Sequence, residues 1–295
     1  MTADIKKVQT STRTRRGKPN WYLRFALRYP VGLASIAVLS IIVILAVTAP
    51  YLTPFSPTAQ DYGAILLPPG GEHLFGTDPL GRDVLTRTLY GARVSLLAAL
   101  IAVGIATLIG VPIGLLAGYR RSRFDELVVM RLIDAVQAFP FLILAMVVTA
   151  ALGTGFQNAM IAIGIAYSPN VIRIVRGATL QVRDLDFVQA AQSLGIRPLR
   201  IVLRHVLPNI LTPLVVQLTV LMASAIIAEA GLSYLGLGTQ PPTPSWGSEL
   251  RAAQGYVFSA PWLAVWPGVA ISVTVLALNL FGDTLRDVLD PKSGK

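Results

Sequence analysis

The sequence contains no cysteine and only two histidines among its 295 residues. Disulfide frameworks, cysteine-ligated metal centres and thiol catalysis are therefore excluded, and a metal site built from several histidines is not expected. Charge is also scarce, because Asp, Glu, Lys and Arg make up 14% of the chain, against about 25% in soluble domains. Hydrophobic residues reach 54%, which excludes a disordered chain and indicates a protein embedded in a membrane.

Several catalytic motifs are missing as well. The phosphate-binding pattern G-x-x-x-x-G-K-[ST] does not occur, since Gly17-Lys18 is followed by Pro19 and Gly294-Lys295 ends the sequence. The zinc-protease pattern H-E-x-x-H and the hydrolase pattern G-x-S-x-G do not occur either. The sequence therefore does not predict an ATPase, a zinc protease or a serine hydrolase, and we expect no enzymatic activity in this chain.

In place of catalytic motifs, the sequence contains long uncharged runs. A membrane-spanning helix needs about 20 largely apolar residues. Five runs qualify by length, namely 31–49, 94–119, 135–172, 206–228 and 252–282. The third run is long enough for two passes, and polar and glycine residues between 153 and 158 indicate a turn in its middle. The sequence therefore predicts an all-α integral membrane protein with six transmembrane helices.

The basic residues are divided unequally between the two sides of the membrane that these six spans define. Of the 25 Lys and Arg residues, 21 fall on one side and 4 on the other. Because cytoplasmic loops carry the excess of Lys and Arg, both termini are expected in the cytoplasm. The net charge of +10 is thus mainly a signal of topology. Nucleic-acid binding by the basic N-terminal segment is the minor alternative, and we expect no nucleic-acid partner.

A few polar or aromatic residues near the ends of the spans are candidates for a gate or a translocation pathway. Asp134 and Gln137 stand at the start of the third span, and Glu229 stands at the outer end of the fifth. Polar and ionisable groups inside membranes are often functional, although all three are expected near an interface, within reach of water. Trp246 lies in a glycine- and proline-rich stretch expected at the outer bilayer edge. An ordinary interfacial role is the alternative for each.

The segment 183–208 is unusually long for a loop between two spans. Val188 and Ala191 recur at helical spacing, and Pro198 can open a second short helix over 199–207. Ala190, Ala191 and Gly195 leave a smooth surface on which the groove of another protein could fit. An amphipathic helix resting on the bilayer explains the same pattern equally well.

The same segment resembles the EAA signature of permeases from importers of the ATP-binding-cassette class. That signature reads E-A-A-x-x-x-G, then nine residues, then I-x-L-P. The matching positions here are Gln189, Ala190, Ala191, Gly195, Leu207 and Pro208. Gln189 replaces the acidic residue of the signature, and His205 replaces its isoleucine.

Three further stretches narrow the resemblance. Residues 73–96, 229–248 and 279–291 resemble C-type permeases of dipeptide, oligopeptide and nickel importers. The resemblance implies a type I importer transmembrane domain over 93–282, with the segment 186–208 as the loop that couples to an ATPase. It also implies an added first span over 31–52, followed by an extracytoplasmic loop over 53–92. A basic cytoplasmic segment 1–30 and a cytoplasmic tail 283–295 complete the expected organisation.

The resemblance further implies partners and a location. A homologous second permease, two ATP-binding subunits and an extracytoplasmic solute-binding protein are expected, all at a bacterial inner membrane and in contact with its lipid. ATP and magnesium would bind the partner subunits, so no cofactor is expected in this chain. The implied function is to form half of the pathway for di- and oligopeptides by alternating access.

Two alternatives remain open from the sequence. The first is the nickel branch of the same family, or another small solute. Nickel favours metal-ligating side chains, and His73 is the one histidine expected outside. The second is a stand-alone secondary transporter, which would usually show discontinuous helices in paired halves. No internal repeat is apparent, and the middles of the runs carry no charged residue.

Overall fold

The computed structural model describes residues 28–120 and 128–289, and these residues form a helical bundle with no β-strand. The predicted basic segment 1–30 lies almost wholly outside the described residues, as do the last six residues of the predicted tail. The helices are α2 (Pro30–Leu52), α3 (Val84–Arg120), α4 (Met130–Gln137), α5 (Phe141–Leu152), α6 (Phe156–Arg183), α7 (Asp186–Ser193), α8 (Pro198–Ile201), η2 (Val202–Val206), α9 (Leu207–Tyr234), α10 (Trp246–Ala253), η3 (Gln254–Tyr256) and α11 (Trp262–Leu289).

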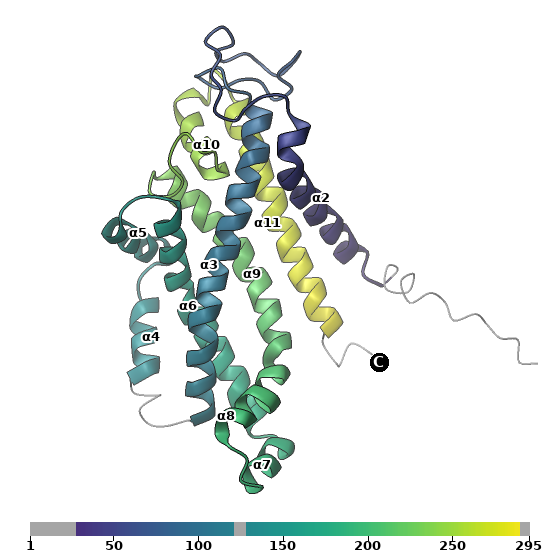
Figure 1. The fold of residues 1–295 in the computed structure, drawn as a ribbon, viewed down its shortest axis with the longest axis vertical. Helices are drawn as coiled ribbons and strands as arrows, with labels where there is room; N and C mark the ends of the chain where they lie inside the picture. The colour runs from purple at the N-terminus through teal and green to yellow at the C-terminus, as the bar shows by residue number, and fades with distance from the viewer. Residues whose placement is uncertain (1–27, 121–127, 290–295) are drawn as a thin grey trace, which may run out of the picture.

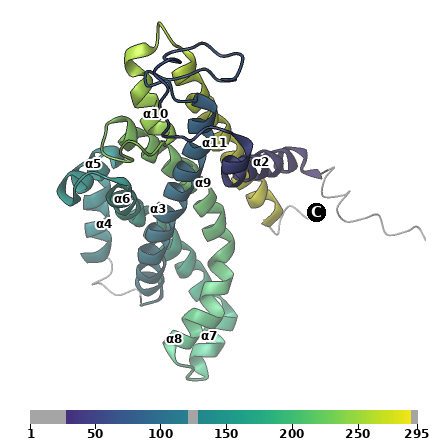
Figure 2. The same cartoon turned by 45° about the horizontal axis from the view of Figure 1, so that its top comes forward.

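Long helices run the length of the bundle, and short elements close its two ends (Figure 1). The helices α10 and η3, together with the loops around them, form a cap, which we define as residues 53–83 and 235–261. The helices α7 and α8 lie at the opposite end. The turned view in Figure 2 keeps this arrangement, with α2 beside α11 at one margin and α4 and α5 at the other.

Five helices are long and apolar enough to cross a membrane, and α4 and α5 pass the same test only as a bent pair, which makes a sixth span when the pair is counted as one. This agrees with the six predicted spans, but α4 and α5 meet at 94° rather than forming one straight helix. The bend follows from Pro140, which has no N–H to donate and disfavours a helical conformation at the residue before it. Apolar side chains on both sides of Pro140 hide the break from hydropathy.

The helix α3 begins at Val84, ten residues before the uncharged run that predicted it. The expected loop 53–92 is therefore shorter, and its last residues belong to this helix. The Asp83 carboxylate caps the first turn, since its Oδ2 accepts hydrogen bonds from the Thr86 backbone N–H at 2.8 Å and from the Thr86 hydroxyl at 2.7 Å. Arg87 lies in the second turn and is buried through an ion pair described below.

Small residues let α3 and α6 pack closely along their length. The glycines of α3 at positions 110, 114 and 118 face α6 at four-residue intervals. A Cβ on Gly114 would lie 2.7 Å from the Cβ of Val175, closer than real Cβ atoms approach. The spacing of these glycines thus serves helix packing, as small residues commonly do in membranes.

We expect Gly114→Ala to lower the free energy of unfolding by about 1–3 kcal/mol, because the added methyl overpacks the contact with α6. Gly104 provides the matched control in the same helix, since a Cβ there would meet no atom within 4 Å. Gly104→Ala should leave stability unchanged or raise it by up to about 1 kcal/mol. Thermal unfolding of the purified chains in detergent measures both, and equal effects would contradict the packing argument.

Candidate functional sites at the two ends of the bundle

The segment 186–208 is an ordered hairpin of short helices at one end of the bundle. Val188 and Ala191 of α7 are buried and face the bundle, whereas Ala190 is exposed. The prediction that Ala191 contributes to an exposed smooth surface is therefore wrong, because Ala191 packs inward. Gln189 is exposed as well, and its Nε2 donates to the backbone oxygen of Asp184 at 3.1 Å.

Gly195 ends α7 in a left-handed conformation, with φ of 70°. The Gly195 N–H donates to the Gln192 oxygen at 2.9 Å, and the Ile196 N–H donates to the Ala191 oxygen at 3.3 Å. These two bonds form a Schellman motif, which usually has glycine at this position. Gly195 is exposed, and a side chain there would meet no atom within 4 Å. The glycine is thus required by the backbone conformation rather than by a neighbouring side chain.

The second helix of this segment differs from its prediction over 199–207. The helix α8 spans Pro198–Ile201 only, and the π-helical turn η2 then leads without a break into α9. Pro208 stands in the first turn of α9 and cannot donate a hydrogen bond to a carbonyl of the preceding turn. A π turn accommodates such a missing donor. Leu207 is half-buried and Pro208 is exposed at the same end.

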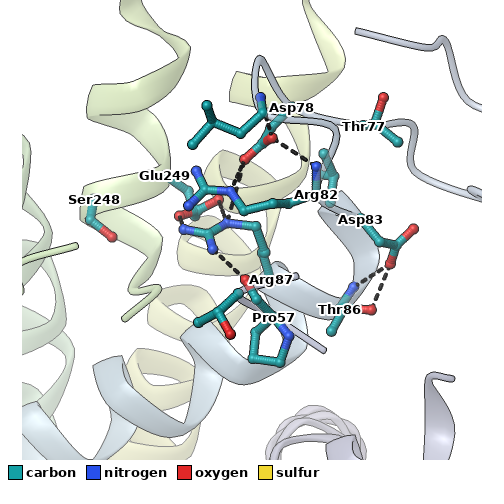
Figure 3. Close-up of polar contacts among 12 residues, drawn as sticks. Pro57, Thr77, Asp78, Arg82, Asp83, Thr86, Arg87, Ser248 and Glu249 are labelled. Atoms are coloured by element: carbon teal, nitrogen blue, oxygen red, sulfur yellow. Dashed lines mark hydrogen bonds and ion pairs between the residues drawn. The ribbon is translucent and has the colours of Figure 1, made fainter. Parts of the chain in front are cut away.

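A buried cluster of charges holds the cap together (Figure 3). The Arg87 guanidinium donates to both oxygens of the Glu249 carboxylate, at 2.9 and 2.7 Å. Arg87 also donates to the backbone oxygen of Pro57. Arg82 Nε donates to Asp78 Oδ2 at 2.6 Å, and Arg87 Nε lies 3.8 Å from that oxygen. The cluster therefore joins the loop before α3, α3 itself and α10.

Sequence reasoning missed this cluster. Arg87 and Glu249 stand 162 positions apart, and neither lies in a motif that pairs it with the other. Both are buried, with 3% and 8% of their surface exposed. A bidentate arginine–carboxylate pair is among the strongest polar contacts in proteins, and its geometry fixes both partners.

Glu229 and Trp246 lie together between α3, α9 and α10, in the core rather than at the surface. Glu229 is fully buried, and its two oxygens accept hydrogen bonds from Ser95 Oγ at 2.8 Å and Ser233 Oγ at 2.7 Å. The prediction that Glu229 reaches water is therefore wrong. The apolar helices around the carboxyl exclude water, and serine hydroxyls on α3 and α9 satisfy it instead.

Trp246 is 1% exposed and is the largest fully buried side chain in the described residues. Its side chain is therefore packed inside the protein, and its expected depth near the outer bilayer edge stays a prediction. The Trp246 N–H donates to Ser95 Oγ at 3.2 Å, and its indole Nε1 donates to the Thr88 oxygen at 3.1 Å. These bonds fasten the start of α10 to α3. A part in gating remains a prediction for Glu229 and for Trp246.

Asp134 and Gln137 lie on α4 and contact α6. Asp134 Oδ1 accepts a hydrogen bond from Arg173 at 2.6 Å, and both side chains are exposed. Gln137 Nε2 donates to Asn170 Oδ1 at 2.7 Å. A hollow of about 370 Å³ opens at the bend between α4 and α5, and Gln137 and Asn170 line it. The bend therefore brings one predicted pathway residue to a polar hollow, and the pathway role stays a prediction.

The two histidines are far apart in the fold. His73 Nδ1 lies 2.9 Å from Asp83 Oδ1 in the cap, and His205 lies in η2 at the other end. Within residues 28–120 and 128–289, no three His, Cys, Asp or Glu side chains are grouped so that they could hold a metal ion.

The sequence is similar to named transport proteins over most of its length. It is 44% identical over 267 residues to the di/tripeptide transport system permease protein DppC of Pseudomonas aeruginosa, covering 88% of each chain. It is 41% identical over 268 residues to the dipeptide transport system permease protein DppC of Haemophilus influenzae, covering 89% of this chain and 90% of the relative. For the probable D,D-dipeptide transport system permease protein DdpC of Escherichia coli, identity is 39% over 288 residues, with coverage of 98% and 95%.

The fold is similar to that of a chain in the MetNI methionine ABC transporter in an inward-facing conformation, with a TM-score of 0.58. That likeness covers 69% of this chain and 96% of the other at 20% identity, so it speaks for the fold alone. Residues 24–69 match the N-terminal transmembrane domain of oligopeptide transport permease C. Residues 110–295 match the binding-protein-dependent transport system inner membrane component. The chain therefore belongs to the family of inner membrane components of binding-protein-dependent transport systems.

Proposed function

We propose that this chain is one of two homologous permease subunits in an ATP-driven importer of di- and oligopeptides. The observation that carries the proposal is the near full-length similarity to permeases named for dipeptide and di/tripeptide transport. The proposed complex contains two ATP-binding subunits and an extracytoplasmic solute-binding protein, and it lies in a bacterial inner membrane. ATP and magnesium bind the partner ATPases, which explains why this sequence has no phosphate-binding loop.

In this proposal the segment 186–208 docks in a groove of one ATPase. Exposed Ala190 and Gly195 leave room for close approach of another protein. Buried Val188 and Ile201 tie the segment to the bundle, so that a displacement of the segment displaces the spans attached to it. ATP-driven closure of the ATPases then opens the pathway on one side of the membrane, and their separation opens it on the other.

The proposed orientation places α7 and both termini in the cytoplasm and the cap outside. Its support is the set of arginines at the α7 end of the bundle, which includes Arg120, Arg183, Arg200 and Arg204. Lys and Arg concentrate on the cytoplasmic side of membrane proteins. The cap end carries four arginines, and two of them are buried in ion pairs.

Two experiments test the proposal. Purification of the chain from its native membrane in mild detergent, followed by mass spectrometry, should recover a second permease and ATP-binding subunits. Recovery of a stable, folded chain alone would favour a stand-alone transporter. Uptake of radiolabelled alanyl-alanine should be lost on deletion of the chain and restored by its return. Deletion that abolishes nickel uptake and spares peptide uptake would overturn the peptide assignment in favour of the nickel branch.

A further inference from the structure

A hollow of about 470 Å³ lies where the cap meets the spans. Three segments line it: α3 through Arg93, the start of α6 through Phe156, and the loop after α9 through Gln240 and Thr243. A second hollow of about 390 Å³ shares Gly155 and Phe156 with the first and includes Asn158. The Gly155 N–H donates to the Leu237 oxygen at 3.1 Å, which joins the α5–α6 turn to the loop after α9.

Two side-chain amides at these hollows are held in the same way, each with its NH₂ group turned toward backbone oxygens of the protein. Gln240 Nε2 donates to the backbone oxygens of Gly236 and Gly238, both at 2.9 Å. Asn158 Nδ2 donates to the oxygens of Leu152 and Gly153, at 2.8 and 3.0 Å. An amide has two N–H donors and one carbonyl acceptor, so both donors are used in each case. Within the described chain neither carbonyl oxygen accepts a hydrogen bond, and each remains available to a ligand that donates.

Arg93 supplies the positive charge at the same place. Its guanidinium lies 5.8 Å from the centroid of the Tyr90 ring, and no described carboxylate lies within ion-pair distance of it. The carboxylates of Asp78 and Glu249 are already committed to Arg82 and Arg87 in the buried cluster. The two adjoining hollows therefore combine one cation without a described counter-charge, two amide oxygens and an apolar wall.

We propose that these hollows are a subsite for a short peptide with free termini, a proposal that rests on the peptide importer function above. The Arg93 guanidinium binds the C-terminal carboxylate, for which its planar fork of donors is suited. The oxygens of Gln240 and Asn158 accept hydrogen bonds from the ammonium and amide N–H groups. Val94, Leu97 and Phe156 contact the peptide side chains.

The absence of cysteine from the sequence makes a direct test possible, because a single introduced thiol reports on this place alone. Thr243→Cys places the thiol on the wall of the hollow, and Leu97→Cys serves if the first variant does not fold. Membranes carrying the full-length chain with its own partner subunits are treated with an anionic methanethiosulfonate reagent. The labelling rate of this chain is then measured with and without alanyl-alanine.

Saturating alanyl-alanine should slow labelling by about tenfold, whereas alanyl-alaninamide and N-acetyl-alanyl-alanine should have little effect. Arg93→Gln should abolish the protection, and Arg93→Lys should restore part of it. Arg286→Gln is the control, since Arg286 is an exposed arginine in the last turn of α11, outside both hollows. It should leave protection intact.

Equal protection by alanyl-alaninamide, absence of protection when Arg93 is intact, or loss of protection in Arg286→Gln would each overturn the subsite. The readout needs no transport, so it separates this proposal from the proposed function. Protection by alanyl-alanine without ATP-driven peptide uptake would uphold the subsite and refute the importer function. Peptide uptake without protection would uphold the importer function and refute the subsite.

Discussion

Ala190→Asp is expected to reduce ATP-driven uptake by about tenfold or more while the chain stays in the membrane at its normal level. Ala190 is exposed on α7, so the new carboxylate costs little in the free chain. In the proposed complex the same carboxylate is buried against an ATPase, and a charge without a partner in an interface is strongly unfavourable. A loss of about 1.4 kcal/mol in the free energy of docking lowers the binding constant tenfold. Uptake and ATP hydrolysis are measured together in vesicles, with membrane levels as reference.

Ala190→Ser is the matched control for size, and it should retain uptake. Ala191→Asp makes a contrasting variant, because Ala191 is buried and the substitution should disturb the segment itself. Gly195→Asp should also uncouple ATP hydrolysis from uptake, since it adds a carboxylate to the exposed end of α7, whereas Asp tolerates the left-handed backbone of this position better than most residues do. Gly195→Asn should retain more uptake than Gly195→Val, as asparagine adopts this conformation more readily. Normal uptake in both Ala190→Asp and Gly195→Asp would refute the docking proposal.

Arg87→Met should lower the free energy of unfolding by about 3–5 kcal/mol. The substitution leaves the Glu249 carboxylate buried without its bidentate partner, and it removes the donor to the Pro57 oxygen. The cap should loosen first, because this contact joins the loop before α3 to α10. Thermal unfolding in detergent measures the loss, and limited proteolysis should show new cleavage within residues 53–83.

The double variant Arg87→Met with Glu249→Leu should recover most of that stability, since replacing a whole buried pair with apolar residues is often neutral or better. Arg251→Met controls for removal of an exposed arginine from the same cap and should change stability little. A double variant whose loss of stability equals the sum of the losses in Arg87→Met and Glu249→Leu alone would show that the ion pair itself is not what stabilises the cap.

Hydropathy and charge predicted most of the fold, because lipid leaves a chain few alternatives to apolar helices. The uncharged runs predicted six spans, and the polar turn at 153–158 correctly separated α5 from α6. The right-angled bend before α5 was not predicted. Its cause, Pro140, lies in an apolar stretch where neither charge nor length signals a break.

The candidate sites were predicted less completely, since their geometry depends on contacts between distant positions. The position of α7 and the glycine that ends it follow from local patterns, and the signature at 189–195 indicated them. The burial of Ala191 depends on the bundle beneath it. Glu229 was expected near water, because no sequence rule reveals that Ser95 on another helix supplies its hydrogen bond. The same holds for the pair of Arg87 and Glu249.

The continuity of α8, η2 and α9 has a mechanical consequence. Together they form 37 residues of helix from Pro198 to Tyr234, which at 1.5 Å per residue is a rod of about 55 Å. One end begins within the segment 186–208. The other end leads into the loop in which the Leu237 oxygen accepts a hydrogen bond from the Gly155 N–H. In the proposed importer such a helix would couple a displacement of the segment 186–208 to a displacement of the cap end. In the proposed importer, closing the pathway on one side of the membrane and opening it on the other would then be a single movement, and no second signal would have to cross the membrane.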